Sequence, residues 1–206
     1  LITGAGSGIG AATARLMVSE GAHVAVTGIP GDGVISVAGE IVASGGSVVA
    51  IPTDVTDPRQ VESAVTQTVG SFGSVDILVA NAGIQMHQED RTLHDLAEDV
   101  WDQTHDVNYK GQYFTCKYGL AQMVRQTEGG VVILVASITA LRGTSPNVSY
   151  AAGKAGVVNL ARHIAVHYGP NGIRANSISP GPLERTPDFD NHPDPEGREK
   201  EYLDRI

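Results

Sequence analysis

The chain has 206 residues, of which 41% are hydrophobic and 18% charged, a composition typical of one globular domain with a sizeable core. Its 14 basic and 23 acidic residues give a formal charge of −9, which argues against partners such as nucleic acids or anionic membranes. Cys116 is the only cysteine, so neither an internal disulfide nor a cysteine metal cluster can form. Because we find no signal-peptide pattern and no apolar run of membrane-spanning length, we expect a cytoplasmic protein.

The first elements are a short strand at residues 1–3, a glycine-rich turn and a helix at residues 11–20. Gly4, Gly8 and Gly10 lie in the turn, at a spacing that differs from the common G-x-G-x-x-G pattern. Glycine lets a ligand approach the backbone, and the positive end of a helix attracts an anion. The pattern predicts a phosphate-binding site, with a plain tight turn as the alternative. The helix side chains expected to face the core are Ile9, Ala12, Leu16 and Val18.

Apolar runs and helical segments alternate along the rest of the chain. The expected strands are residues 22–27, 47–51, 75–80, 131–136 and 173–178. The expected helices are residues 34–43, 58–72, 96–116 and beyond, and 150–168. Asp57 before Pro58 predicts an N-cap followed by proline at the first helical position, and Gly73 ends that helix. Strands joined through helices form right-handed βαβ units, so we expect an α/β protein with a parallel sheet.

The end of the second strand lacks a feature that dinucleotide sites often have. An acidic residue at this position commonly bonds the adenosine ribose, but here the sequence reads Gly28-Ile29-Pro30. Asp32 follows after a Pro-Gly break, and the sequence does not fix whether its carboxylate reaches the site.

Residues 84–93 form a polar and irregular stretch. His87, Asp90, His94 and Asp95 are residue types that bind metals, but their spacing does not place a ligand set on one helix face. We therefore expect a solvated loop at this point and no metal site.

Three polar features follow later in the chain. Asn108 lies within a helical pattern, where asparagine is unfavourable, which hints at a special role; an ordinary exposed asparagine is the alternative. Ser137 follows the most apolar run, and ligands of open α/β sheets bind beyond the carboxyl ends of strands. Tyr150 and Lys154 lie four residues apart and share a helix face. An ammonium near a phenol lowers its pKa from about 10, which makes a proton-transfer group, although an isolated pair of this kind is more often a solvated helix face.

Together these motifs resemble those of the short-chain dehydrogenase/reductase family, from Thr3 to about Pro182. In the family's order and spacing they are TGAGSGIG at residues 3–10, Asp54-Val55, Asn81-Ala82-Gly83, Asn108, Ser137, Tyr150-x-x-x-Lys154 and Pro180-Gly181. The resemblance implies a single Rossmann-type domain over residues 1–206, a doubly wound parallel sheet in strand order 3-2-1-4-5-6 with helices on both faces. It also implies a nicotinamide cofactor, NAD(H) or NADP(H), which carries the hydride and needs no metal.

The resemblance further implies a role for each motif. Tyr150 would exchange a proton with the substrate oxygen, and Ser137 would orient that oxygen. Lys154 would hold the nicotinamide ribose and lower the pKa of Tyr150, and Asn108 would hold a water that links Lys154 to solvent. Asp54 would bond the adenine edge. The cofactor-binding residues implied are Gly4, Ser7, Gly8, Ile9, Gly10, Asp54, Val55, Asn81, Ala82, Gly83, Tyr150, Lys154, Pro180 and Gly181.

The sequence departs from the family pattern at the positions that distinguish the two dinucleotides. Gly28 replaces the acid typical of NAD enzymes, while Ser7 and Ile29 stand where NADP enzymes usually carry a basic residue. A 2′-phosphate dianion without a cation is penalised more than a ribose hydroxyl that lacks one hydrogen bond. We therefore expect a preference for NAD(H).

The leading functional hypothesis is an oxidoreductase of secondary alcohols and ketones. The alternatives are a non-catalytic, redox-sensing dinucleotide binder of the same fold and a relative with lyase or dehalogenase chemistry. Ser137, Tyr150 and Lys154 are all present and the glycine turn is whole, which favours the oxidoreductase. Sugars, polyols, hydroxy acids, steroids and acyl thioesters all stay open as substrates.

Three further expectations concern the ends of the chain and its assembly. We expect residues 183–206, rich in proline and charge, to form a substrate-covering flap. The family adds a last helix and a seventh strand beyond the position of Ile206, so we expect both termini of this chain to be truncated. Apolar faces on the long helices predict a homodimer or homotetramer.

Overall fold

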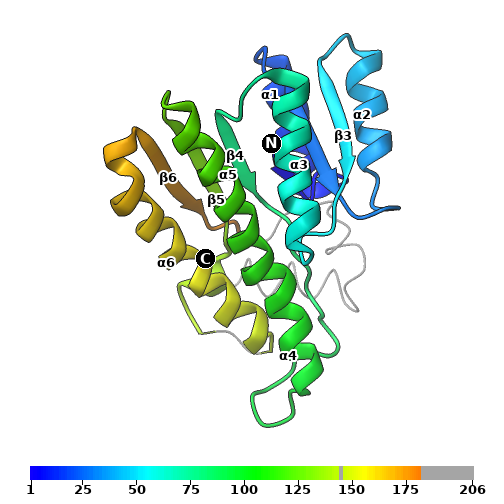
Figure 1. The fold of residues 1–206 in the computed structure, drawn as a ribbon. Helices are drawn as coiled ribbons and strands as arrows, with labels where there is room; N and C mark the ends of the chain where they lie inside the picture. Colours follow the sequence, from blue (N-terminus) through cyan, green and yellow to red (C-terminus); the bar gives the residue numbers. More distant parts are fainter. Residues whose placement is uncertain (144–145, 182–206) are drawn as a thin grey trace.

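The computed structural model describes residues 1–143 and 146–181 as one layered α/β fold (Figure 1). Its strands are β1 (Ile2–Thr3), β2 (Val24–Gly28), β3 (Val48–Pro52), β4 (Ile77–Ala80), β5 (Gly130–Val135) and β6 (Ile173–Ile178). They form one sheet in the order β3-β2-β1-β4-β5-β6, and all neighbouring strands are parallel. The fold class and the strand order predicted from the sequence are therefore confirmed.

Helices cover both faces of this sheet. They are α1 (Gly8–Ser19), α2 (Val34–Ala43), α3 (Pro58–Phe72), α4 (Glu98–His105), α5 (Gln112–Gln126) and α6 (Val148–Tyr168). Figure 1 shows α3, α5 and α6 across one face, where Leu78 and Leu134 of the sheet pack in the larger core cluster. Helices α1 and α2 bury the opposite face, where Ile2 and Val26 lie in a second cluster. None of the described helices combines the length and the apolar character that a membrane crossing requires.

The ends of α3 follow the local sequence signals. Asp57 Oδ1 accepts a hydrogen bond of 2.9 Å from the backbone N–H of Arg59, and Pro58 occupies the first helical position. Gly73 ends the helix at φ 86°, a left-handed conformation that suits glycine. The predicted start and stop of this helix are confirmed.

Helix α1 differs from its prediction in start and in phase. It begins at Gly8, within the glycine turn, and its buried residues are Gly10, Ala11 and Ala14. Leu16, which we expected to face the core, is 64% exposed, so that prediction is wrong. Side chains without bulk let the helix approach the sheet closely, and the turn rather than the largest apolar residues sets which face turns inward.

The long helical stretch after residue 97 is interrupted. A π-helical turn, η1 (Asp106–Gly111), separates α4 from α5 and contains Asn108, whose side chain is fully buried. π-Turns of this kind are frequent at functional sites. The structure excludes the alternative of an ordinary exposed asparagine.

The segment between β4 and α4 contains no regular helix or strand. Five of the ten residues 84–93 are exposed and four are half-buried, but Asp90 is completely buried. The prediction of a solvated loop is therefore wrong for Asp90, whose carboxylate bonds backbone groups of α6. The described residues contain no cluster of histidine, cysteine or acidic side chains that could hold a metal ion. The flap predicted at residues 183–206 lies outside the described part of the chain.

Candidate active site

The glycine turn between β1 and α1 presents bare backbone at the carboxyl end of the central strand. Gly4 and Gly8 have φ values of 62° and 49°, which glycine adopts without strain. Ser7 precedes the helix in an extended conformation, and its side chain makes no capping bond. The first N–H groups of α1 can therefore face an anion, and a dinucleotide pyrophosphate fits this turn. Ile9 lies in the first turn of α1 and packs against the second core cluster, which contains Ile2 and Val26.

Asn81, at the end of β4, holds the turn in place. Its Nδ2 donates hydrogen bonds of 2.9 Å to the carbonyl oxygens of both Thr3 and Gly4. The Thr3 hydroxyl accepts bonds from the N–H groups of Asn81 and Ala82, at 3.1 and 3.2 Å. A Cβ added at Gly10 would lie 2.7 Å from Asn81 Nδ2, so this glycine allows the close contact. The ends of β1 and β4 are thus locked side by side.

Gly83 follows β4 and lies close to both the π-turn η1 and helix α6. A Cβ built on it would stand 2.7 Å from Asn108 Oδ1 and 3.3 Å from Lys154 Nζ. The glycine therefore keeps open the space in front of two polar groups from different helices. That space adjoins the end of β4, next to the turn that Asn81 holds.

The side-chain amide of Asn108 forms hydrogen bonds with backbone groups of the protein. Its Oδ1 accepts a bond of 3.1 Å from Ile84 N, and its Nδ2 donates to the carbonyl oxygens of Ile84 and Thr104 at 2.8 and 3.0 Å. Asn108 thereby fixes the start of the loop after β4 against the π-turn. The sequence predicted a special position here, and the structure gives its local reason.

Lys154 is a buried lysine of helix α6. Only 2% of it is exposed, and its Nζ donates a bond of 2.8 Å to the carbonyl oxygen of Val135, the last residue of β5. Burial penalises the ammonium and lowers the pKa of Lys154 to about 8. This lysine therefore gives up its proton at a lower pH than an exposed lysine would.

The phenol ring of Tyr150 lies beside this ammonium, with 5.6 Å between Lys154 Nζ and the ring centroid. Ser137 follows β5 directly, and its Oγ accepts bonds from the N–H and the hydroxyl of Thr139 at 3.2 and 3.0 Å. The helix α6 packs against the short 3-10 turn η2 (Ile138–Ala140) that Ser137 begins. Serine, tyrosine and lysine thus stand on adjoining elements at one end of the sheet.

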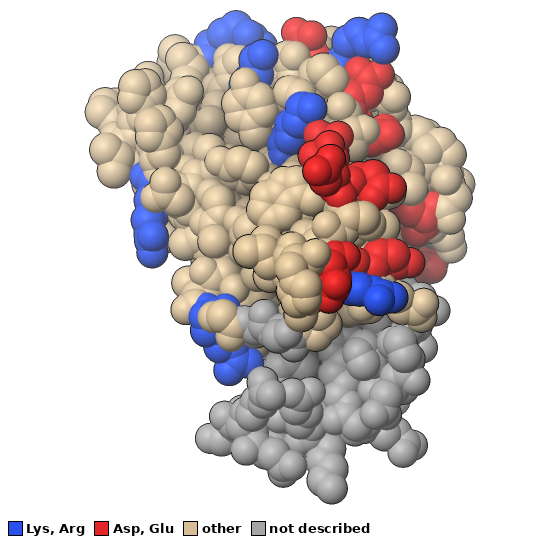
Figure 2. Space-filling model, turned by 90° about the horizontal axis from the view of Figure 1, so that it is seen from below, with Lys and Arg blue, Asp and Glu red and all other residues tan. Residues whose placement is uncertain are grey.

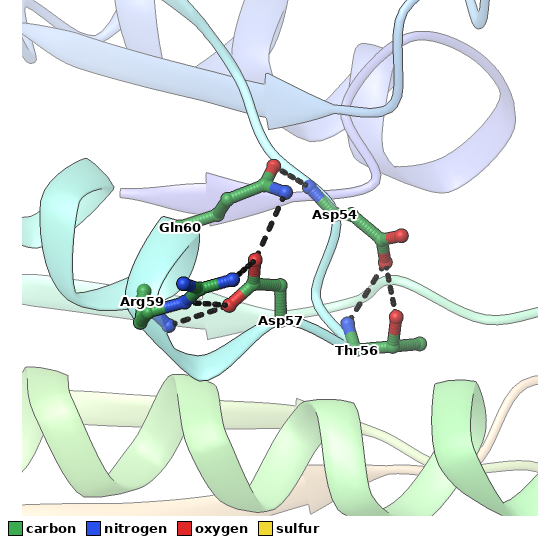
Figure 3. Close-up of polar contacts among 5 residues, drawn as sticks. All are labelled: Asp54, Thr56, Asp57, Arg59 and Gln60. Atoms are coloured by element: carbon green, nitrogen blue, oxygen red, sulfur yellow. Dashed lines mark hydrogen bonds and ion pairs between the residues drawn. The ribbon is translucent and has the colours of Figure 1, made fainter.

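Asp54 lies in the loop between β3 and α3 (Figure 3). Its Oδ1 accepts bonds from the N–H and hydroxyl of Thr56 at 2.9 and 2.8 Å, and its N–H donates to Gln60 Oε1. The neighbouring Val55 is buried, and its side chain would meet a Cβ at Gly111 at 2.7 Å. These bonds hold the loop where the resemblance expects the adenine edge.

The residues after β6 close the same end of the sheet. The carbonyl oxygen of Pro180 accepts a bond of 3.0 Å from the N–H of Ile138. A Cβ on Gly181 would lie 3.9 Å from the Ile138 side chain. The predicted Pro180-Gly181 motif thus borders the turn that Ser137 begins.

The carboxylate of Asp32 lies at Gly28, the position where the sequence lacks the expected acidic residue. A Cβ added at Gly28 would overlap Oδ2 of Asp32, and one added at Gly6 would meet its Oδ1 at 2.6 Å. Asp32 Oδ1 also accepts a bond of 3.0 Å from Val34 N at the start of α2. The carboxylate therefore lies where a side chain of Gly28 would be, which the sequence could not establish.

The surface at this end of the molecule is unevenly charged. Figure 2, a view from below Figure 1, shows acidic side chains gathered on one half of the face, with lysines and arginines scattered around them.

Three residues important to this geometry were missed from the sequence. Thr3 and Gln112 were missed because their partners come from remote strands; Gln112 Nε2 donates to the same Val135 carbonyl as Lys154, at 3.0 Å. Asp90 was missed because a carboxylate in a polar loop carries no local sign of burial. For Thr3, its place directly before the glycine turn was the available signal.

The fold and site define a nucleotide-binding α/β oxidoreductase with a tyrosine and a buried lysine on one helix. A family model described as "short chain dehydrogenase" matches residues 1–196, and the chain belongs to that family. It is an NAD(P)-dependent enzyme that acts on CH–OH groups.

Named relatives agree with this class. L-rhamnose 1-dehydrogenase (NAD(P)(+)) of Sphingomonas sp. (strain SKA58) is 39% identical over 97% of this chain and 78% of its own length. Cis-4-hydroxycyclohexanecarboxylate dehydrogenase of Sinomonas cyclohexanicum is 39% identical over 88% of this chain and 71% of its own. The crystal structure of levodione reductase superposes with a TM-score of 0.89 at 32% identity, and covers 98% of this chain and 80% of that one.

Proposed function

We propose that the chain oxidises a secondary alcohol or reduces the matching ketone with Tyr150 as the proton-exchanging residue. The observation that carries this proposal is the buried ammonium of Lys154, 5.6 Å from the Tyr150 ring. A nearby cation favours the phenolate and brings the phenol into a useful range for proton transfer. Ser137 Oγ, held by Thr139, orients the substrate oxygen toward the phenol.

The dinucleotide lies along the carboxyl end of the sheet in this proposal. Gly4, Ser7, Gly8, Ile9 and Gly10 hold the pyrophosphate, and Lys154 holds the nicotinamide ribose. When bound, the nicotinamide supplies the carbon that exchanges hydride with the substrate. The other residues proposed to line the cofactor are Asp54, Val55, Asn81, Ala82, Gly83, Tyr150, Pro180 and Gly181.

Asn108 has a more specific proposed role. Its side chain bonds Ile84 and Thr104, so the proton path from Lys154 to solvent would use a water at the π-turn backbone rather than the amide. In this way Asn108 shapes the path that returns a proton to Lys154.

We further infer that NAD(H) is preferred over NADP(H). The support is the Asp32 carboxylate, which lies against Gly28 and Gly6 and can accept bonds from the ribose hydroxyls. A 2′-phosphate at the same place would meet this anion. Fluorescence titration should therefore give a lower Kd for NAD+ than for NADP+. The Asp32→Ala variant should show a smaller ratio between these two Kd values. The exposed Asp95→Ala serves as the control, and tighter binding of NADP+ by the unaltered protein would refute the preference.

For the substrate we propose a hydroxyl on a six-membered ring. Two relatives support this class, because one is named for L-rhamnose and the other for cis-4-hydroxycyclohexanecarboxylate. Nicotinamide absorbance should change with these two compounds or with cyclohexanol, and far more slowly with butan-2-ol. Turnover confined to butan-2-ol would overturn the ring preference, and no turnover on a broad panel of alcohols and ketones would favour a non-catalytic dinucleotide binder. A cytoplasmic location and assembly into a homodimer or homotetramer stay predictions.

A further inference from the structure

The loop between β4 and α4 reaches the first turn of the catalytic helix through one buried residue, Asp90. Its Oδ1 accepts a hydrogen bond of 3.0 Å from Ser149 N, and its Oδ2 accepts one of 2.8 Å from Tyr150 N. Its carbonyl oxygen accepts a third bond, of 2.9 Å, from Asn147 N. Three backbone donors at the start of α6 are therefore satisfied by a residue about sixty positions earlier in the chain.

Asp90 takes the place of a cap that the helix does not provide for itself. Asn147 occupies the N-cap position, but at φ 79° its side chain makes no capping bond, and its buried Oδ1 finds no hydrogen-bond partner among residues 1–143 and 146–181. The first N–H groups of a helix need partners, and a carboxylate there is also stabilised by the helix dipole. Asp90 is completely buried, so water does not compete for these bonds.

The same loop is anchored at the rest of the site. It begins at Gly83 and Ile84, which Asn108 holds against the π-turn. Further along, Asp90 N donates a bond of 2.7 Å to the carbonyl oxygen of Met86. Residues 83–90, held by these hydrogen bonds, thus connect the space beside Lys154 Nζ with the backbone of Tyr150.

We propose that Asp90 is a positioning residue: by capping α6 from the β4–α4 loop, it fixes the position and orientation of Tyr150 in the active site. This inference rests on the proposed role of Tyr150 in proton exchange. Misplacing a reacting group by about 1 Å can cost on the order of 100-fold in rate. Because the hydrogen bonds of Asp90 run to α6 and to Met86 rather than to the glycine turn, dinucleotide binding should be independent of it.

Asp90→Ala and Asp90→Asn test the proposal, with Asp95→Ala as the matched control. Asp95 is exposed on the same loop, and its carboxylate bonds the nearby Thr92 and His94. The readouts are kcat per bound NAD+, using the panel alcohol with the highest turnover, and the Kd and stoichiometry of NAD+ from titration. A role in folding alone would lower the stoichiometry of NAD+ sites and leave kcat per site unchanged.

We expect kcat per site to fall about 10- to 100-fold in Asp90→Ala, with Kd for NAD+ within about twofold of the parent value. Asp90→Asn keeps one acceptor oxygen in place of two, so its kcat should fall about 3- to 10-fold. Parent-level kcat per site in Asp90→Ala would overturn the proposal. If Asp90→Ala does not fold, Asp90→Asn decides in the same way. An inactive Tyr150→Phe beside an unimpaired Asp90→Ala would refute this inference alone, whereas an active Tyr150→Phe would refute the proposed function.

Discussion

Lys154 Nζ donates a hydrogen bond of 2.8 Å to the carbonyl oxygen of Val135, and so ties helix α6 to the last residue of β5. Ser137 lies two residues after Val135, and Tyr150 lies one helical turn before Lys154. One buried bond therefore links the strand that supplies the serine to the helix that supplies the tyrosine. Several consequences of this arrangement can be measured.

Tyr150→Phe should abolish turnover and leave dinucleotide binding nearly unchanged. The substitution removes the exchangeable proton but keeps the ring beside the Lys154 ammonium. We expect kcat to fall by at least about 100-fold, the lower end of the range for removing a general acid or base. Stopped-flow absorbance measures kcat, and a NAD+ titration measures dinucleotide binding. Parent-level turnover in the variant would show that Tyr150 does not exchange the proton.

Lys154→Met should inactivate the enzyme and stabilise the fold at neutral pH. The pKa of Lys154 is lowered from 10.5 to about 8, so between these values the unfolded chain binds a proton that the folded chain lacks. The free energy of unfolding of the parent therefore rises as pH increases from about 8 to 10.5, and the cost of burying the ammonium is fully present below pH 8. We expect the variant to gain about 2–3 kcal/mol at pH 7.

Urea denaturation at pH 7 and at pH 9.5 measures this difference. The advantage of Lys154→Met should shrink at the higher pH, because the parent lysine is then largely neutral in the folded state. An advantage that stays constant across this interval would show that burial of the charge is not its cause.

Gly83→Ala should lower kcat by about tenfold or more, because its Cβ would stand 2.7 Å from Asn108 Oδ1 and 3.3 Å from Lys154 Nζ. Gly70→Ala in α3 is the matched control, since a Cβ there meets nothing within 4 Å. The control should keep full activity and gain about 0.5–1 kcal/mol of stability from the better helix propensity of alanine. Steady-state kinetics and thermal unfolding of both variants test the prediction, and equal activity would contradict it.

Gln112→Leu should leave stability unchanged or raise it. Gln112 Oε1 is buried and has no hydrogen-bond partner in the described part of the chain, and the Val135 carbonyl keeps its bond from Lys154 when Nε2 is removed. Replacing a partly satisfied buried amide by an apolar side chain of similar size is close to neutral. Gln112→Glu instead buries a carboxylate against the Val135 carbonyl and should lose several kcal/mol. Urea unfolding of the pair checks this, and a strongly destabilised leucine variant would indicate a bridging partner for Oε1.

The sequence predicted much of the fold because its signals were local. Helix α2 and strand β6 match their expected bounds of 34–43 and 173–178, and the cap, proline and terminal glycine of α3 lie where they were predicted. Strands joined by helices leave few parallel topologies open, which is why the order of the sheet could be expected. The inward face of α1 was missed because the preceding turn, rather than apolar bulk, sets its rotation.

The amino-acid sequence by itself determined the chemistry available to this protein: a glycine turn before a helix, a serine at a strand end, and Tyr150 one turn before Lys154. Tertiary structure alone decided how these groups are held. It brought Asp32 against Gly28, turned Asp90 into a cap for α6, and gave Lys154 its buried bond to Val135. The reason is physical, because burial and partners across about sixty residues depend on how elements pack, and no local pattern of side chains encodes that packing.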